Sequence, residues 1–183
     1  STQSRSSAAS DVYKRQLSDC PVPTIARIQG DVYAGGMGLV AACDMAVAAE
    51  GAGFCLSETR IGLIPATIGP YVVRAMGRRA AQRYLLTAER FDAAEAHRLG
   101  LVHTVVAADG LDAAVDGLVQ ALRAAGPQAV RACKRLLREV ADRPVDDALI
   151  ARTVEGIAEI RASDEGRAGV SAFLAKQAPP WLP

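Results

Sequence analysis

The stretch that decides the fold of this chain is Asp31-Val32-Tyr33-Ala34-Gly35-Gly36-Met37-Gly38-Leu39-Val40. Its glycines have no Cβ, so the backbone here can turn sharply, enter a helix and present bare N–H groups to an anionic or polarised oxygen. From Gly36 to Cys43 the residues are small or apolar on every side, which predicts a short helix that is buried all round. Such a loop suits either a phosphate or an oxyanion.

Short strands are predicted around this stretch. The β-branched run 24–28 follows a stiff Pro-Val-Pro segment and leads into the glycine stretch. Residues 45–48 and 53–56 have the pattern of two further strands, and Ser57-Glu58 follows directly at the end of the second. The carboxylate of Glu58 is therefore expected near the end of a strand.

Helical patterns dominate later in the chain. Helical spacing on either side of Gly77 predicts a pair of helices, and Asp92 with Glu95 resembles a capping box that starts another. Gly100 ends that helix before a strand over 101–106. Four more helices are then expected over residues 111–125, 128–140, 145–160 and 164–176. The change of period places a boundary near residue 107, between a part over 17–107 that alternates strands and helices and a helical part over 108–183.

The first 16 residues do not read as part of this fold. Residues 6–16 resemble the translation of a transposase adaptor that is used to prepare DNA for sequencing. We therefore expect residues 1–16 to be a non-native or disordered tail, and the native chain to begin at Leu17.

Composition excludes several classes of function. The chain has 183 residues, of which 50% are hydrophobic and 22% charged, and its net charge is +1, so a basic surface for nucleic acid is not expected. No apolar run reaches the about 18 residues that a membrane span needs, and a cytoplasmic location is the default expectation. The four cysteines lack CxxC spacing and only two histidines could join them, so no metal site is predicted.

A dinucleotide-binding loop is one interpretation of the glycine stretch. Residues 36–41 match the pattern GxGxxA, and Glu58 lies where a ribose-binding acid could be. A dinucleotide loop begins as its strand ends, however, and residues 29–35 intervene here. The preceding run is also short and interrupted by Arg27, which argues against a central parallel strand.

The other interpretation is an oxyanion site. The N–H of Gly35, at the start of the buried helix, would stabilise charge that develops on an acyl oxygen, and Glu58 would move the proton. This is the chemistry of a thioester enolate. From the residues alone it stays open, because a single glutamate at a strand end is usually a solvated surface acid.

A family resemblance favours the second interpretation. Over nearly all of 17–183 the chain resembles the enoyl-CoA hydratase/isomerase (crotonase) superfamily in the order and spacing of its motifs. These motifs include Pro23-Thr24-Ile25-Ala26, Gly35-Gly36, Cys43-Asp44, Phe54, Glu58, Gly62, Pro65, Gly77, Leu86-Thr87-Ala88 and Ala96-Gly100-Leu101-Val102. Residues 54–66 are similar to the bacterial branch that hydrates methylglutaconyl-CoA and related branched acyl-CoAs.

The resemblance implies a fold, a substrate and a set of site residues. It implies an α/β chain with a ββα spiral core and a C-terminal helical trimerisation region, in a homotrimer or hexamer that binds acyl-CoA thioesters. No separate cofactor is implied, since coenzyme A is part of the substrate. Gly35 would supply an oxyanion N–H and Glu58 would be the general acid/base. Substrate contacts are implied for Val32, Tyr33, Gly36, Ser57, Ala66, Phe173 and Lys176.

Gly38 departs from the family pattern. Many hydratases carry a second glutamate at this position, which activates the water, and this chain has glycine. Hydration managed by Glu58 with another polar group is one reading, and double-bond isomerisation by a single glutamate is another. A non-catalytic assembly protein is a third. Family members are also longer than this chain, so we expect a fragment that lacks the first strands of the core and the second oxyanion N–H, and that is inactive by itself.

Overall fold

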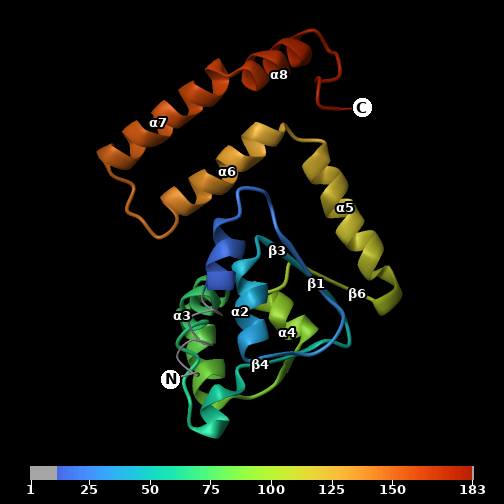
Figure 1. The fold of residues 1–183 in the computed structure, drawn as a ribbon, viewed down its shortest axis with the longest axis vertical. Helices are drawn as coiled ribbons and strands as arrows, with labels where there is room; N and C mark the ends of the chain where they lie inside the picture. Colours follow the sequence, from blue (N-terminus) through green and yellow to red (C-terminus); the bar gives the residue numbers. More distant parts are fainter. Residues whose placement is uncertain (1–11, 183) are drawn as a thin grey trace. The chain divides into compact units, whose positions relative to one another are not determined.

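The structure is a computed structural model that describes residues 12–182. It divides into two compact units (Figure 1). Unit 1 contains residues 24–116 with the described residues up to Cys20, and unit 2 contains Pro21–Pro23 and the chain from Gly117 onward. The division falls inside helix α5, whereas the change of sequence period predicted a boundary at residue 107.

Two three-stranded sheets form the centre of unit 1. Their strands are β1 (Ile25–Ile28), β2 (Val32–Tyr33), β3 (Met45–Ala49), β4 (Gly53–Cys55), β5 (Phe91–Asp92) and β6 (Thr104–Val106). One sheet has the order β1-β3-β6 and is parallel throughout. The other has the order β2-β4-β5, in which β2 is parallel and β5 antiparallel to β4. The α/β class is therefore confirmed, although the two-residue strands β2 and β5 are too short to show a sequence pattern.

Helices lie between the strands of unit 1 and after its last strand. They are α2 (Gly35–Ala42), the 3₁₀ turn η1 (Ser57–Ile61), α3 (Gly69–Thr87), α4 (Ala93–Arg98), the 3₁₀ turn η2 (Ala108–Gly110) and α5 (Leu111–Arg123). Gly77, with φ 77° and ψ 156°, breaks α3 into the two predicted helices. The Asp92 carboxylate accepts a hydrogen bond from the Glu95 N–H at 2.8 Å, as the predicted helix start requires.

The strand predicted over 101–106 begins later, at Thr104. The N–H groups of Leu101 and Val102 donate to the carbonyl of Ala96, at 3.0 and 3.2 Å, instead of joining the sheet. Both side chains are nevertheless buried in the core, so their apolar character does not depend on strand pairing. The hydrophobic run over 101–106 therefore predicted burial correctly but overestimated the length of the strand.

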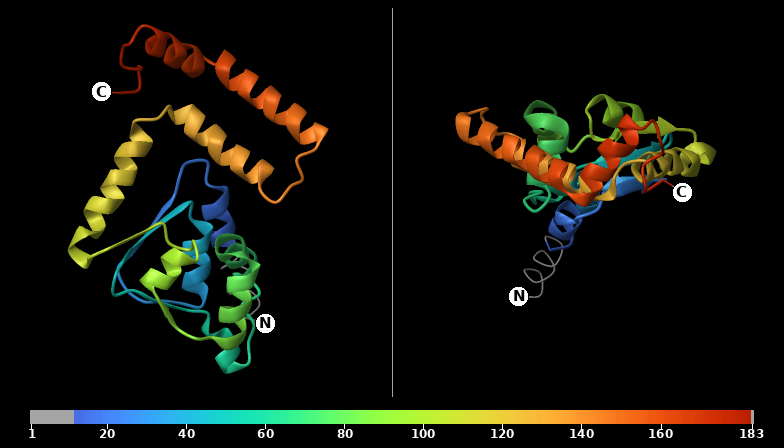
Figure 2. Two further views of the ribbon diagram at one scale, coloured as in Figure 1. Left: turned by 180° about the vertical axis from the view of Figure 1, so that it is seen from behind. Right: turned by 90° about the horizontal axis from the view of Figure 1, so that it is seen from above.

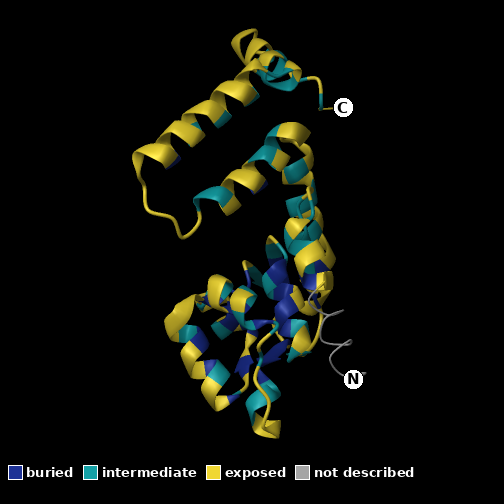
Figure 3. Ribbon diagram, turned by 60° about the vertical axis from the view of Figure 1, so that its left-hand side comes forward, coloured by how far each residue is buried: buried dark blue, intermediate teal, exposed yellow. Residues whose placement is uncertain are grey.

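A hydrophobic core lies in unit 1. Buried residues are drawn in dark blue in Figure 3, on the strands and on parts of the helices. Met37, Phe54, Leu56, Ile68 and Val72 are each at most 1% exposed. Helix α2 contributes Met37 and Val40 to this core, but Leu39 is 43% exposed. The prediction that this helix is buried all round is thus wrong for the described chain, since one side of α2 faces outward.

Residues 12–19 form a helix that belongs to unit 1. Lys14 on this helix is fully buried and donates to the hydroxyl of Thr67 at 3.5 Å. Residues 12–16 are thus helical in the structure, and of these five residues only Lys14 is buried. Residues 1–11 lie outside the described part of the chain, and an adaptor origin stays a prediction.

Unit 2 consists of helices in the order that the sequence predicts. Beyond the end of α5 they are α6 (Pro127–Val140), α7 (Asp147–Ala162) and α8 (Asp164–Leu174), drawn in orange to red in Figure 2. The Glu165 carboxylate at the start of α8 accepts from the first amides of α6, Gln128 at 2.9 Å and Ala129 at 2.8 Å. This anion at a helix N-terminus fixes α6 against α8.

Neither a membrane helix nor a metal cluster is found in residues 12–182. None of the described helices combines the length and the apolar character that crossing a bilayer requires. Within the same residues, no three His, Cys, Asp or Glu side chains gather in a way that could hold a metal ion.

A polar cluster joins the end of α3 to α4. The Tyr84 hydroxyl donates to Glu95 at 2.8 Å, and the Arg98 guanidinium donates to the same carboxylate at 2.6 Å. The bonds from Arg98 and Tyr84 lower the pKa of Glu95 to about 2. Burial, followed by the bond to Glu95, raises the pKa of Tyr84 to about 12.

We predict that this cluster limits stability at both ends of the pH range. The Glu95 carboxylate stabilises the fold fully above pH 4.5, its ordinary pKa, and this contribution is lost as the pH falls toward 2. Neutral Tyr84 stabilises the fold below pH 10, and its contribution is lost as the pH rises through 12. Urea unfolding of Tyr84→Phe should show a smaller alkaline loss than the parent chain. A Tyr71→Phe variant, which keeps the Tyr84–Glu95 bond, is the control, and equal losses in all three proteins would contradict the assignment.

Candidate active site

Strand pairing brings the two predicted catalytic residues to one edge of a sheet. Strands β2 and β4 are parallel, with Tyr33 opposite Cys55. Gly35 begins α2 just after β2, and Glu58 lies in η1 just after β4. The N–H of Ala34 donates to the carbonyl of Cys55 at 3.0 Å and joins the two strand ends. The carboxyl ends of adjacent parallel strands are where α/β proteins usually place their ligands.

Glu58 has an unusual environment for a carboxylate. Its Oε2 atom is buried, and it has no hydrogen-bond partner among the described residues. Buried polar atoms in proteins are almost always hydrogen-bonded, because an unpaired one loses its solvation without compensation. The surface-acid reading of Glu58 therefore does not hold for this oxygen.

The first turn of α2 presents amides to the same edge. The first N–H groups of a helix have no intrahelical acceptor, and α2 has no acidic residue in its first turn to offset the positive end of its dipole. A Cβ at Gly35 would meet nothing within 4 Å, whereas a Cβ at Gly36 would lie 3.3 Å from Val32 Cγ1. A side chain at position 35 would thus meet no neighbour, whereas one at position 36 would press on Val32.

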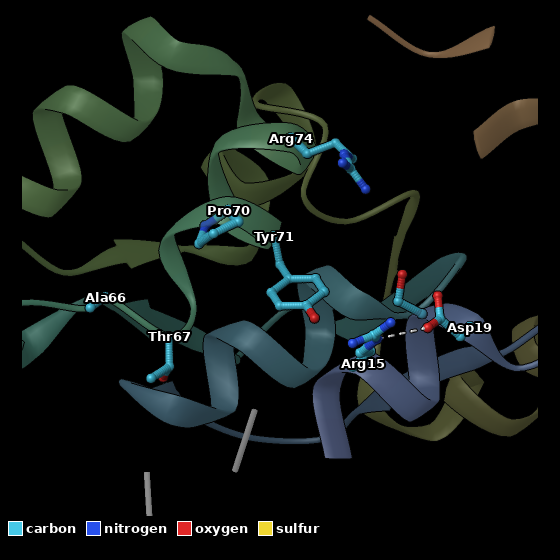
Figure 4. Close-up of a pocket in the computed structure, with 8 residues that line it drawn as sticks. Arg15, Asp19, Ala66, Thr67, Pro70, Tyr71 and Arg74 are labelled. Atoms are coloured by element: carbon cyan, nitrogen blue, oxygen red, sulfur yellow. Dashed lines mark hydrogen bonds and ion pairs between the residues drawn. The ribbon is translucent and has the colours of Figure 1, made fainter. Parts of the chain in front are cut away.

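Predicted substrate contacts lie around two hollows of unit 1. Val32, Tyr33 and Gly36 line an open groove of about 600 Å³ along β1, β2 and α2. Ala66 lines a second pocket of about 460 Å³, in which the Tyr71 ring lies between Thr67 and the Arg15–Asp19 ion pair in the view of Figure 4. The half-buried Ser57 precedes Glu58 in η1 and lines neither hollow.

The two C-terminal residues of the predicted site belong to unit 2. Phe173, in the last turn of α8, is 81% exposed. Lys176 follows this helix in a left-handed backbone conformation, with φ 54°. Their contacts with substrate stay predictions.

Gly38 is held as glycine by its neighbours. A Cβ at this position would lie 2.8 Å from Ile68 Cβ, closer still to Ile68 Cγ2, and 2.9 Å from Lys14 Cδ. Ile68 is 1% exposed and part of the core, so it cannot move aside easily. Its side chain occupies the space that a second glutamate would need. This role of Ile68 could not be predicted from the sequence, because its side chain is apolar and carries no reactive group.

The model of the family described as enoyl-CoA hydratase/isomerase matches residues 1–182. The chain belongs to the enoyl-CoA hydratase/isomerase family. Among solved structures, an enoyl-CoA hydratase from Shewanella pealeana superposes on this family member with a TM-score of 0.93 at 43% identity. The match covers 98% of the chain and 67% of that enzyme. The crotonase-like fold with its C-terminal helical region is thereby confirmed.

Two curated relatives of this family member are named as hydratases. Enoyl-CoA hydratase ACTT6 of Alternaria alternata is 37% identical over 155 residues, which are 84% of this chain and 52% of that protein. Mevalonyl-coenzyme A hydratase sidH of Aspergillus fumigatus is 35% identical over 166 residues, which are 88% of this chain and 60% of that protein. The chain thus spans about half to two thirds of the length of these relatives.

Proposed function

We propose that this chain carries the catalytic carboxylate of an enoyl-CoA hydratase, which adds water across the α,β double bond of an acyl-CoA thioester. The observation that carries the proposal is the buried Oε2 of Glu58, which has no hydrogen-bond partner within residues 12–182. This atom lies at the same sheet edge as the first amides of α2. No separate cofactor is required, since coenzyme A is part of the substrate.

In this proposal Gly35 stabilises the negative charge that the reaction creates, and Glu58 transfers the protons. The Gly35 N–H and the N-terminus of α2 hold the thioester oxygen and stabilise the negative charge that develops there. Water forms a bond to the β-carbon as the double-bond electrons move toward this oxygen. Glu58 takes a proton from the water and returns one to the α-carbon, so the carboxylate is restored after each turnover.

The proposed acyl group is branched or of the glutaconyl type. Support comes from residues 54–66, which resemble the branch that acts on such thioesters, as in leucine breakdown, and from the similarity to a mevalonyl-coenzyme A hydratase. We propose substrate contacts for Val32, Tyr33, Gly36, Ser57 and Ala66. As the family resemblance implies, Phe173 and Lys176 would contact the coenzyme A moiety of a substrate, which in this superfamily is often bound to a neighbouring subunit.

Isomerisation of a 3-enoyl-CoA is the second candidate. The observation that favours it is the packing at Gly38, where Ile68 fills the space of a second carboxylate. Moving a double bond needs only one group that removes a proton and returns it to another carbon. Hydration by Glu58 alone needs the same group to activate water as well.

We predict that hydration of a branched or glutaconyl thioester is faster than isomerisation. The assay compares crotonyl-, methylglutaconyl- and 3-enoyl-CoA, using the chain itself and a completed protein. The completed protein joins the chain to the part of the Shewanella pealeana enzyme outside the match, which covers 67% of that enzyme. The chain alone is expected to be inactive, since the second oxyanion N–H is expected in that part. Turnover of the 3-enoyl thioester only would favour the isomerase.

We further propose that the protein assembles as a homotrimer or hexamer through its helical region. Ile150, Val154 and Ile157 recur at helical spacing along α7 and are 48%, 60% and 65% exposed. Such a stripe costs hydration free energy unless another surface covers it.

The expected result is that the doubly substituted Val154→Asp, Ile157→Asp chain sediments as a monomer, while the parent chain sediments as a larger species. Charges placed on the stripe would have to be desolvated in the assembly. Glu159→Arg, on another face of α7, is the control and should leave the sedimentation coefficient unchanged. A monomeric parent chain and completed protein would contradict the proposal.

A further inference from the structure

The residue before the oxyanion glycine has a strained backbone. Ala34 has φ 46° and ψ −117°, a positive φ outside the left-handed helical region. Ala88, for comparison, has φ 50° and ψ 26°. A residue with a Cβ pays a steric penalty in the conformation of Ala34, which glycine adopts readily.

Flanking hydrogen bonds hold Ala34 in this conformation. Its N–H donates to the carbonyl of Cys55 at 3.0 Å, and its carbonyl accepts from the N–H of Met37 at 3.0 Å. The first bond fixes Ala34 to the end of β4, three residues before Glu58. The second fixes it to the first turn of α2. Strain of this kind persists only where the surroundings enforce it.

Packing of the Ala34 methyl group does not account for the strain. Among the described residues, Ala34 is neither in the core cluster nor packed against it. The torsion ψ of Ala34, however, sets the plane of the peptide that joins it to Gly35. That peptide carries the N–H assigned above to the thioester oxygen, so the strained residue controls the direction of this donor.

We propose that Ala34 is a positioning residue, whose strained and narrow backbone well holds the Gly35 N–H in the direction of the substrate oxygen. The inference rests on the proposed function of Gly35. A glycine at position 34 would relieve the strain and would also allow the peptide to rotate more freely. In Ala34→Gly the free energy of unfolding should therefore increase, while the rigidity of the Gly35 N–H should decrease.

The first test uses the chain itself, with the Ala34→Gly variant. The equilibrium constant for unfolding should fall about 5-fold, because relief of strain exceeds the extra entropy of the unfolded glycine chain. The ¹⁵N order parameter of the Gly35 N–H should fall from about 0.85 toward about 0.6. Ala88→Gly is the matched control, and it should leave that order parameter unchanged. An Ala34→Gly variant that is less stable, or equally rigid at Gly35, would overturn the proposal.

Kinetics of the completed protein distinguish a positioning role of Ala34 from a purely structural one. Ala34→Gly should lower kcat for crotonyl-CoA about 10-fold and leave KM unchanged, since a misdirected donor weakens the transition state more than substrate binding. If Glu58→Gln abolishes turnover while Ala34→Gly leaves kcat unchanged, the positioning role fails and the proposed function stands. If Glu58→Gln has no effect, the proposed function fails, whatever the rigidity at Gly35.

Discussion

Replacing Glu58 with glutamine is expected to lower kcat for hydration by the completed protein about 10² to 10⁴-fold. Glutamine keeps the shape of the side chain but cannot take a proton from water or return one to the α-carbon. Substrate binding should change little, so the loss should appear in kcat rather than in KM. The decrease in enoyl-thioester absorbance on hydration of crotonyl-CoA measures both constants.

The free energy of unfolding shows whether Glu58→Gln loses only its catalytic group or also destabilises the fold. The Oε2 atom of Glu58 has no hydrogen-bond partner among the described residues, so its replacement breaks no bond of that atom within the chain. Urea unfolding of Glu58→Gln should therefore match that of the parent protein or show a small gain. Glu50→Gln, an exposed carboxylate of unit 1, is the control for both measurements. Full hydratase activity of Glu58→Gln would contradict the role of Glu58, and a completed parent protein without turnover would favour the non-catalytic assembly protein.

Introducing glutamate at Gly38 is expected to destabilise the chain by about 1–3 kcal/mol or more, instead of adding a second catalytic group. Ile68 and Lys14 occupy the space that the new side chain needs, and overpacking a dense core costs about this amount. Enclosing a new carboxylate adds a desolvation cost. The free energy of unfolding in urea is the measurement.

Two further variants test whether packing is the cause. Gly51→Glu is the matched control, because a Cβ at Gly51 would meet nothing within 4 Å, and this exposed position should tolerate the change. Ile68→Ala removes the side-chain atoms nearest to position 38, so Gly38→Glu should cost less in an Ile68→Ala chain than in the parent. Equal stability of Gly38→Glu and Gly51→Glu would show that Gly38 is not constrained by its neighbours.

Local signals in the sequence predicted most of the elements of this fold. Gly77 and Gly100 interrupt or end helices where the backbone has positive φ, and Asp92 caps α4 through its own side chain. These signals act between residues that are close in the chain, so they can be read without the tertiary structure. Helical periodicity likewise predicted α6, α7 and α8.

Features that depend on distant residues were missed or predicted incorrectly. The strands β2 and β5 exist because both pair with β4, and two residues alone carry no periodicity. Glu58 follows β4 as predicted, but the 3₁₀ turn that contains it was not predicted. The helix over residues 12–19 was not expected, because the burial of Lys14 comes from its position beside Thr67 and Gly38.

The sequence by itself determined the family, the order of the elements and the candidate roles of Gly35 and Glu58, since these depend on motifs and their spacing. Only the tertiary structure decided what surrounds them. Parallel pairing of β2 with β4 brings the two residues to one edge, and packing of Ile68 explains why Gly38 is glycine. The strain at Ala34 could likewise not be predicted, because it comes from hydrogen bonds that sequence spacing does not reveal.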